Sequence, residues 1–185
     1  MKKFLCVAGL LMIVAIPAWG GGLGVMASTW DTDQAGGDEG VGFKIDLDLG
    51  GTIDLELRAT WLNEFAFATQ GRQFKLEAMP LDFGLSYGFH EDRKVSPYVG
   101  GGLSFVFLNG STAGGGPLRV DDEAGYYVVG GFDATVSERL GVFAEVLFRD
   151  VSAEFTGDGL LNRDFTDFGA DLGGVGANVG LALTW

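Results

Sequence analysis

Residues 41–61 read VGFKIDLDLGGTIDLELRATW, two strand-length segments joined by a pair of glycines. Apolar side chains occupy the odd positions of both segments, from Val41 to Trp61, and most even positions are charged. Because successive side chains of a β-strand point to opposite faces, each segment has one apolar face and one charged face. The pattern predicts a β-hairpin with a tight turn at residues 50–51.

The same period of two recurs along most of the chain. It predicts strands at residues 23–30, 41–49, 52–61, 74–89, 98–107, 125–136, 140–148 and 175–185. Within 74–89 the apolar parity changes, which predicts a β-bulge at Met79 and Pro80. Short connections at 50–51, 89–96 and 137–139 alternate with longer ones, rich in Gly and Asp, at 31–40, 62–73, 109–123 and 150–172.

The lengths and number of these strands indicate a membrane barrel. Strands of soluble sandwiches average about 5–6 residues, whereas about 9–11 residues cross a bilayer at a tilt. An even number of sequential strands lets the first and last strands pair, and no unpaired edge then meets hydrocarbon. We predict an all-β fold, an eight-stranded antiparallel up-and-down transmembrane β-barrel with short turns at one end and long loops at the other.

The first twenty residues have a different character. Two lysines precede thirteen apolar residues and then PAWG, as in a secretory signal peptide. Ala18 and Gly20 fit the small-residue subsites before cleavage, so we expect a barrel domain at residues 21–185. Gly21 or Gly22 would also serve as the last residue removed. An uncleaved anchor is the alternative, but a spanning helix needs about 20 apolar residues. The one cysteine, Cys6, lies in this segment, so a cleaved chain has no thiol.

The remaining composition argues against several functions. With 25 acidic and 12 basic residues, the chain has a formal net charge of -13 and is a poor partner for nucleic acid. An oxygen nucleophile needs a base near neutral pKa, and the only histidine, His90, falls in a predicted turn. We expect no catalysis and no cofactor. Carboxylates of the long loops form either a solvated rim or a site for hard divalent cations. They are Asp31, Asp33, Asp121, Asp122, Glu123, Asp158, Asp164, Asp167 and Asp171.

The polar parity places a set of charged residues inside the barrel. The set is Lys44, Asp46, Asp48, Asp54, Glu56, Arg58, Lys75, Glu77, Asp82, Asp133, Glu145 and Arg149, eight acids and four bases. Eight strands enclose a bore that side chains can fill. The set therefore forms either a salt-bridged plug or the wall of a narrow pore that favours cations. A charged inner face also disfavours passage of hydrophobic compounds.

Three segments together with the signal-like N-terminus carry a resemblance to a known group. MPLDFGLSYGF (79–89), SPYVGGGLSFVF (96–107) and GYYVVGGFDATVSERLGVFAEV (125–146) resemble hairpins of small Gram-negative outer-membrane barrels. These are the porin-family or opacity-type proteins related to the transmembrane domain of outer-membrane protein A, and the similarity covers most of residues 40–185.

The resemblance implies a location and partners. It implies the bacterial outer membrane, contact with lipid and lipopolysaccharide, and a monomer. It also implies that the barrel-assembly machinery reads the last strand through Val179, Leu181, Leu183 and Trp185. The expected role is structural or surface interaction, in envelope integrity or adhesion through the loops. A narrow diffusion pore is the alternative, and a lipid-modifying enzyme is a weaker one.

Overall fold

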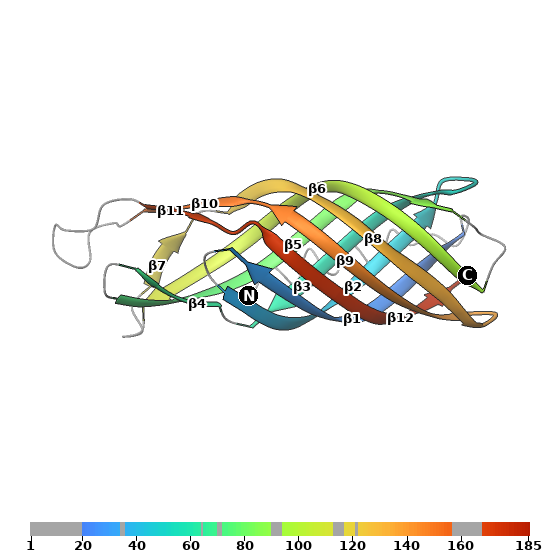
Figure 1. The fold of residues 1–185 in the computed structure, drawn as a ribbon, viewed down its shortest axis with the longest axis horizontal. Helices are drawn as coiled ribbons and strands as arrows, with labels where there is room; N and C mark the ends of the chain where they lie inside the picture. Colours follow the sequence, from blue (N-terminus) through green and yellow to red (C-terminus); the bar gives the residue numbers. More distant parts are fainter. Residues whose placement is uncertain are drawn as a thin grey trace.

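The computed structural model describes residues 20–33, 36–63, 65–69, 72–89, 94–112, 117–120, 122–156 and 168–185. The predicted signal peptide, apart from Gly20, and His90 lie outside these residues. Eight long strands form a closed antiparallel barrel (Figure 1). They are β1 (Gly21–Thr32), β2 (Gly36–Asp48), β3 (Ile53–Leu62), β5 (Arg72–Gly88), β6 (Val95–Thr112), β8 (Glu123–Ser137), β9 (Leu140–Asp150) and β12 (Gly174–Thr184). The predicted fold class is confirmed. In the described part of the chain, no helix is long and apolar enough to cross a membrane.

The barrel closes because β1 pairs with β12 as well as with β2. A row of residues can be followed around the barrel by moving from each residue to its partner on the next strand. The row that starts at Gly22 of β1 returns to β1 at Thr32, ten residues farther along the strand. Its members between these ends are Asp46, Glu56, Gly84, Gly102, Tyr127, Arg149 and Gly174. This stagger fixes the tilt of the strands, and the row places the buried side chains of Glu56, Tyr127 and Arg149 on the inner face.

The two ends of the barrel differ. At the turn end, residues 49–52, 89–94 and 138–139 connect strands, and Gly21 pairs with Trp185. At the opposite end four short strands continue the sheet, and we call them the extension (Figure 1). They are β4 (Phe65–Thr69), β7 (Pro117–Val120), β10 (Ser152–Thr156) and β11 (Phe168–Asp171). Three predicted long loops thus contain strands.

The predicted loop at 31–40 is wrong. Strands β1 and β2 continue to Thr32 and from Gly36, so only residues 33–35 connect them. Gly36 has a φ of 74°, a conformation that glycine adopts without strain and that a tight hairpin connection requires. Asp31, Asp38 and Glu39 therefore lie on paired strands rather than in a loop.

The outward face carries an apolar belt that includes every barrel strand. Valine, leucine and phenylalanine side chains project from it, and most are about half exposed, for example Val146 at 58%. Aromatic residues border the belt at both ends. They are Trp61, Phe105, Tyr126 and Phe148 toward the extension, and Tyr87, Phe89 and Trp185 toward the turn end. Such a belt with aromatic borders matches a hydrocarbon layer between two interfaces.

The bulge predicted at Met79 and Pro80 is wrong. Strands β5 and β6 pair without a register shift from Phe74 opposite Thr112 to Gly88 opposite Tyr98. The parity of β5 is therefore constant, and its even residues from Leu76 to Ser86 face inward.

Pro80 instead marks the end of another ladder. The Gly88 N–H donates to the Thr52 carbonyl at 2.8 Å, so even residues of β5 direct their backbone groups toward β3. Proline has no N–H to donate at this parity. The β3–β5 ladder accordingly stops at Ala59 opposite Leu81, one residue before Pro80. Among the described residues, β5 has no ladder partner on this side until Leu76 pairs with β4.

Candidate functional site: the barrel interior

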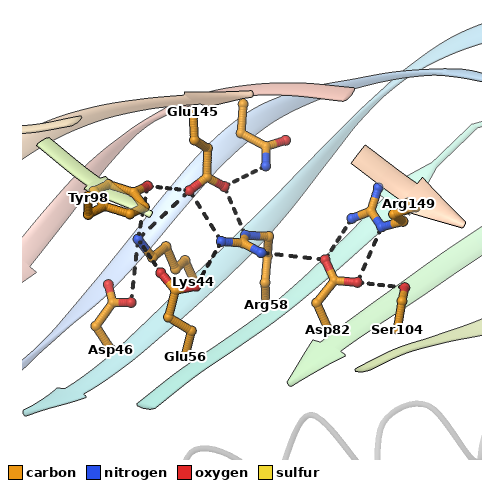
Figure 2. Close-up of polar contacts among 10 residues, drawn as sticks. Lys44, Asp46, Glu56, Arg58, Asp82, Tyr98, Ser104, Glu145 and Arg149 are labelled. Atoms are coloured by element: carbon orange, nitrogen blue, oxygen red, sulfur yellow. Dashed lines mark hydrogen bonds and ion pairs between the residues drawn. The ribbon is translucent and has the colours of Figure 1, made fainter. Parts of the chain in front are cut away.

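Arg58 lies at the centre of a buried charge network (Figure 2). Its Nε is 2.8 Å from Glu145 Oε1, and its Nη2 is 3.4 Å from Glu56 Oε2. On the other side, Nη1 is 3.5 Å from Asp82 Oδ2. The residues come from β3, β5 and β9, so one guanidinium joins three strands across the bore.

Lys44 of β2 extends the network toward the turn end. Its Nζ is 3.2 Å from Glu56 Oε1 and 3.4 Å from Asp46 Oδ1. It also lies 3.3 Å from the Tyr98 hydroxyl and 4.5 Å from the centre of that ring, a cation–π distance. The Tyr98 hydroxyl in turn donates to Glu145. Lys44 thus interacts with acids on its own strand, on β3 and on β9.

Arg149 of β9 extends the network toward the extension. Its Nη2 and Nε lie 2.7 and 3.2 Å from the two oxygens of Asp82, a bidentate ion pair. The Ser104 hydroxyl donates to the same carboxylate at 2.7 Å. The guanidinium lies 5.0 Å from the ring centre of Trp30. Asp82 is therefore shared by Arg58 and Arg149 and connects the two parts of the network (Figure 2).

The buried network is electrically balanced. Three cations, Lys44, Arg58 and Arg149, face three acids, and all six residues are at most 3% exposed. The acids are Glu56, Asp82 and Glu145. Burial of charge is tolerated where each group has opposite charges and hydrogen bonds around it. Large side chains thus occupy the middle of the bore.

The surplus acid lies at the turn end. Four predicted lumen residues, Asp46, Asp48, Asp54 and Asp133, line a cavity of about 320 Å³ that we call the vestibule. Tyr98 and Lys44 also line it. The excess of acids over bases that the sequence indicates thus lies at the turn end, next to the buried network, and Lys44 belongs to both.

Toward the extension the buried side chains are mostly apolar, contrary to the expected charged face. On β6 the next inward-facing residue after Ser104 is Val106. On β5 Leu76 lies farther toward the extension than Asp82. Neither Val106 nor Leu76 has exposed surface. Other buried apolar residues of this outer zone are Trp30, Leu62, Ala78, Leu108, Val151 and Leu172. The sequence does contain a signal for this zone, because FVFL at 105–108 is apolar at both parities.

Two members of the predicted lumen set lie elsewhere. Lys75 and Glu77 are exposed, and their neighbours Leu76 and Ala78 face the interior. The prediction failed because it assigned apolar residues to the lipid face in a region where the interior itself is apolar.

The residues of the predicted assembly signal lie on the outer face of the barrel, and the described acids of the predicted loops lie on or near strands. Val179, Leu181, Leu183 and Trp185 all project outward and are about half exposed. Asp122 Oδ1 accepts the Leu108 N–H at 3.2 Å, and Asp171 Oδ1 accepts the Gly173 N–H at 2.7 Å. Asp31, Asp33 and Glu123 lie on or beside β1 and β8, and Asp121, Asp158, Asp164 and Asp167 lie outside the described residues.

Comparisons with solved structures place this architecture among known folds. No protein-family model and no curated protein matches the chain. The outer membrane protein OprG from Pseudomonas aeruginosa is similar at a TM-score of 0.68 and 13% identity, over 90% of this chain and 97% of that one. E. coli Outer Membrane Protein W has a TM-score of 0.57 and 15% identity, over 90% and 98%. Ail, the attachment invasion locus protein of Yersinia pestis, has 0.54 and 12%, over 90% and 97%. The chain has the fold of the small eight-stranded outer-membrane β-barrels.

Proposed function

We propose that this protein resides in the bacterial outer membrane as a sealed barrel with a structural or surface-interaction role. The observation that carries the proposal is the balanced network around Arg58, which occupies the middle of the bore. Outer-membrane lipid and lipopolysaccharide would surround a monomer inserted by the barrel-assembly machinery. The extension would then present its strands outside the cell, where they serve envelope integrity or adhesion.

The network favours a plug over a pore for an electrostatic reason. A permeating cation would have to displace Lys44 or Arg58 from carboxylates that have no exposed surface. Breaking one buried ion pair leaves its partner uncompensated, at a cost of about 3–5 kcal/mol. The barrier for conduction is therefore high, although the vestibule itself is acidic.

Conductance in planar bilayers tests the seal. Protein refolded in detergent should insert without unitary current steps. A variant that loses one opposite-charge pair, Arg58→Ser with Glu145→Ser, removes bulk and should conduct if it folds, which heat-modifiable gel mobility checks. Reproducible unitary steps in the unchanged protein would overturn the sealed barrel and support the pore.

The two roles within this proposal predict different phenotypes. Ail, whose name records attachment and invasion, shares the fold, which supports a role at the surface. If the role is envelope integrity, a strain that lacks the gene should lose resistance to detergent. A gene copy that encodes the protein without residues 157–167 should restore this resistance. If the role is adhesion, the same copy should reach the surface but fail to restore binding to host cells.

A second candidate function rests on the outer zone and on the interrupted ladder at Pro80. The buried residues Leu76 and Val106 form an apolar interior next to the wall position where β3 and β5 cease to pair. An apolar molecule that entered from outside could leave sideways into the membrane there without crossing the charged network. This candidate would make the protein an entry route for small apolar compounds.

Uptake by cells tests this candidate. Cells with the protein should take up a radiolabelled n-alkane several-fold faster than cells without it. Pro80→Ala, which restores an N–H toward β3, should slow the uptake while the folded protein remains at the same level. Equal uptake with and without the protein would reject the candidate.

A further inference from the structure

We propose that cleavage between Gly20 and Gly21 creates an α-ammonium group that is part of the site at the turn end. The new group pairs with Asp48 and Asp46 in the vestibule and so joins the start of β1 to the end of β2. The inference rests on the proposed export of the chain. In the cleavage, signal peptidase adds water across the peptide bond, which leaves a carboxylate on Gly20 and an amine on Gly21 that takes up a proton.

The start of β1 is held at the wall of the vestibule. The Gly21 N–H donates to the Trp185 carbonyl at 3.3 Å, and the Trp185 N–H donates to the Gly21 carbonyl at 3.1 Å. Gly21 and Gly22 line the vestibule together with Asp46 and Asp48. The nitrogen at which cleavage would place the charge is therefore already ordered beside these two acids.

The carboxylates of both acids lie close to the two residues next to Gly21. A Cβ atom built on Gly20 would lie 3.3 Å from Asp48 Oδ2, and one built on Gly22 would lie 3.9 Å from Asp46 Oδ2. Asp48 uses its other oxygen, Oδ1, to accept the Gly50 N–H at 2.6 Å, which fixes the carboxylate. Oδ2 thus faces the backbone at the cleavage position.

The charge distribution gives a reason for a cation at this position. Among the described residues that line the vestibule, Lys44 is the only base, and its ammonium also interacts with Glu56 and Glu145 of the buried network. The other charged residues that line the vestibule are four aspartates. A positive group hydrogen-bonded to a carboxylate makes a stronger bond than a neutral donor does, so the α-ammonium would stabilise the mouth of the barrel.

The local packing also explains why the position is a glycine. A Cβ atom on Gly21 would lie 2.5 Å from the Asp46 carbonyl oxygen, closer than a side chain allows. Cleavage removes the Gly20 carbonyl, which accepts the Asp48 N–H at 2.9 Å. The new ammonium compensates for this lost bond by binding the side chain of the same residue.

Two measurements test the proposal. First, the intact mass of protein extracted from outer membranes should correspond to residues 21–185, and any other first residue would overturn the proposal. An uncleaved chain outside the outer membrane would show instead that the export on which the inference rests has failed.

The second measurement compares refolded protein that starts at Gly21 with a free or an acetylated amine. Acetylation should speed unfolding in urea about five-fold, and this effect should disappear in Asp46→Asn with Asp48→Asn. In the control Asp133→Asn, on the far wall of the vestibule, the effect should persist. Heat-modifiable gel mobility confirms that each variant folds. If the double variant keeps the full effect, or the control loses it, the ion pair does not form.

Discussion

At the scale of single residues, Arg58 connects the barrel interior across the bore, because its guanidinium touches three buried carboxylates from three strands. Arg58→Ala leaves those acids without their shared cation. We expect the free energy of unfolding to fall by about 3–5 kcal/mol, measured by urea titration of protein refolded in lipid vesicles. Lys75→Ala, which removes an exposed cation, should change it by less than about 0.5 kcal/mol. Equal losses in the two variants would contradict the buried network.

Asp82 and Arg149 should behave as one unit because their contact is bidentate. Asp82→Asn and Arg149→Met each leave a buried charge with one fewer partner, whereas the double variant removes both. We expect a coupling free energy of about 1–3 kcal/mol in a double-mutant cycle. Additive effects of the two substitutions would show that the two side chains do not interact in the membrane.

At the scale of the strand, Pro80 decides where the wall between β3 and β5 ends. Pro80→Ala supplies an N–H that points toward Thr60, so the ladder should extend beyond Ala59 and Leu81. We expect slower amide exchange at residue 60, a protected new amide at residue 80, and a gain of about 0.5–1.5 kcal/mol in stability. Hydrogen–deuterium exchange in vesicles measures this. Unchanged protection would mean that proline is not the cause of the interruption.

At the scale of the whole molecule, the apolar belt requires hydrocarbon on its outer side. Val146 lies midway along β9 and Val136 lies near the turn that follows β8, and both are about 60% exposed. Val146→Arg should cost about 2–4 kcal/mol of folding free energy in lipid vesicles, and Val136→Arg about 0–1 kcal/mol. Similar costs at both positions would be inconsistent with a belt buried in a bilayer.

The sequence by itself determined the eight strands, their order and which face of most of them meets lipid. The reason is that successive side chains of a strand point to opposite faces. A strand with one apolar and one charged face therefore shows in its sequence which side chains face lipid. The hairpin at 41–61 was predicted with its correct turn and parity, and six members of the predicted lumen set meet in one buried network.

Only the tertiary structure decided what fills each level of the interior. Alternation cannot distinguish a lipid-facing leucine from one that packs inside, so Leu76 and its charged neighbours Lys75 and Glu77 were assigned to the wrong faces. The partners of Arg58 are likewise set by the stagger of the closed sheet, which brings distant strands together across the bore. Pairing across a closed barrel depends on register and tilt, and these are properties of all eight strands together.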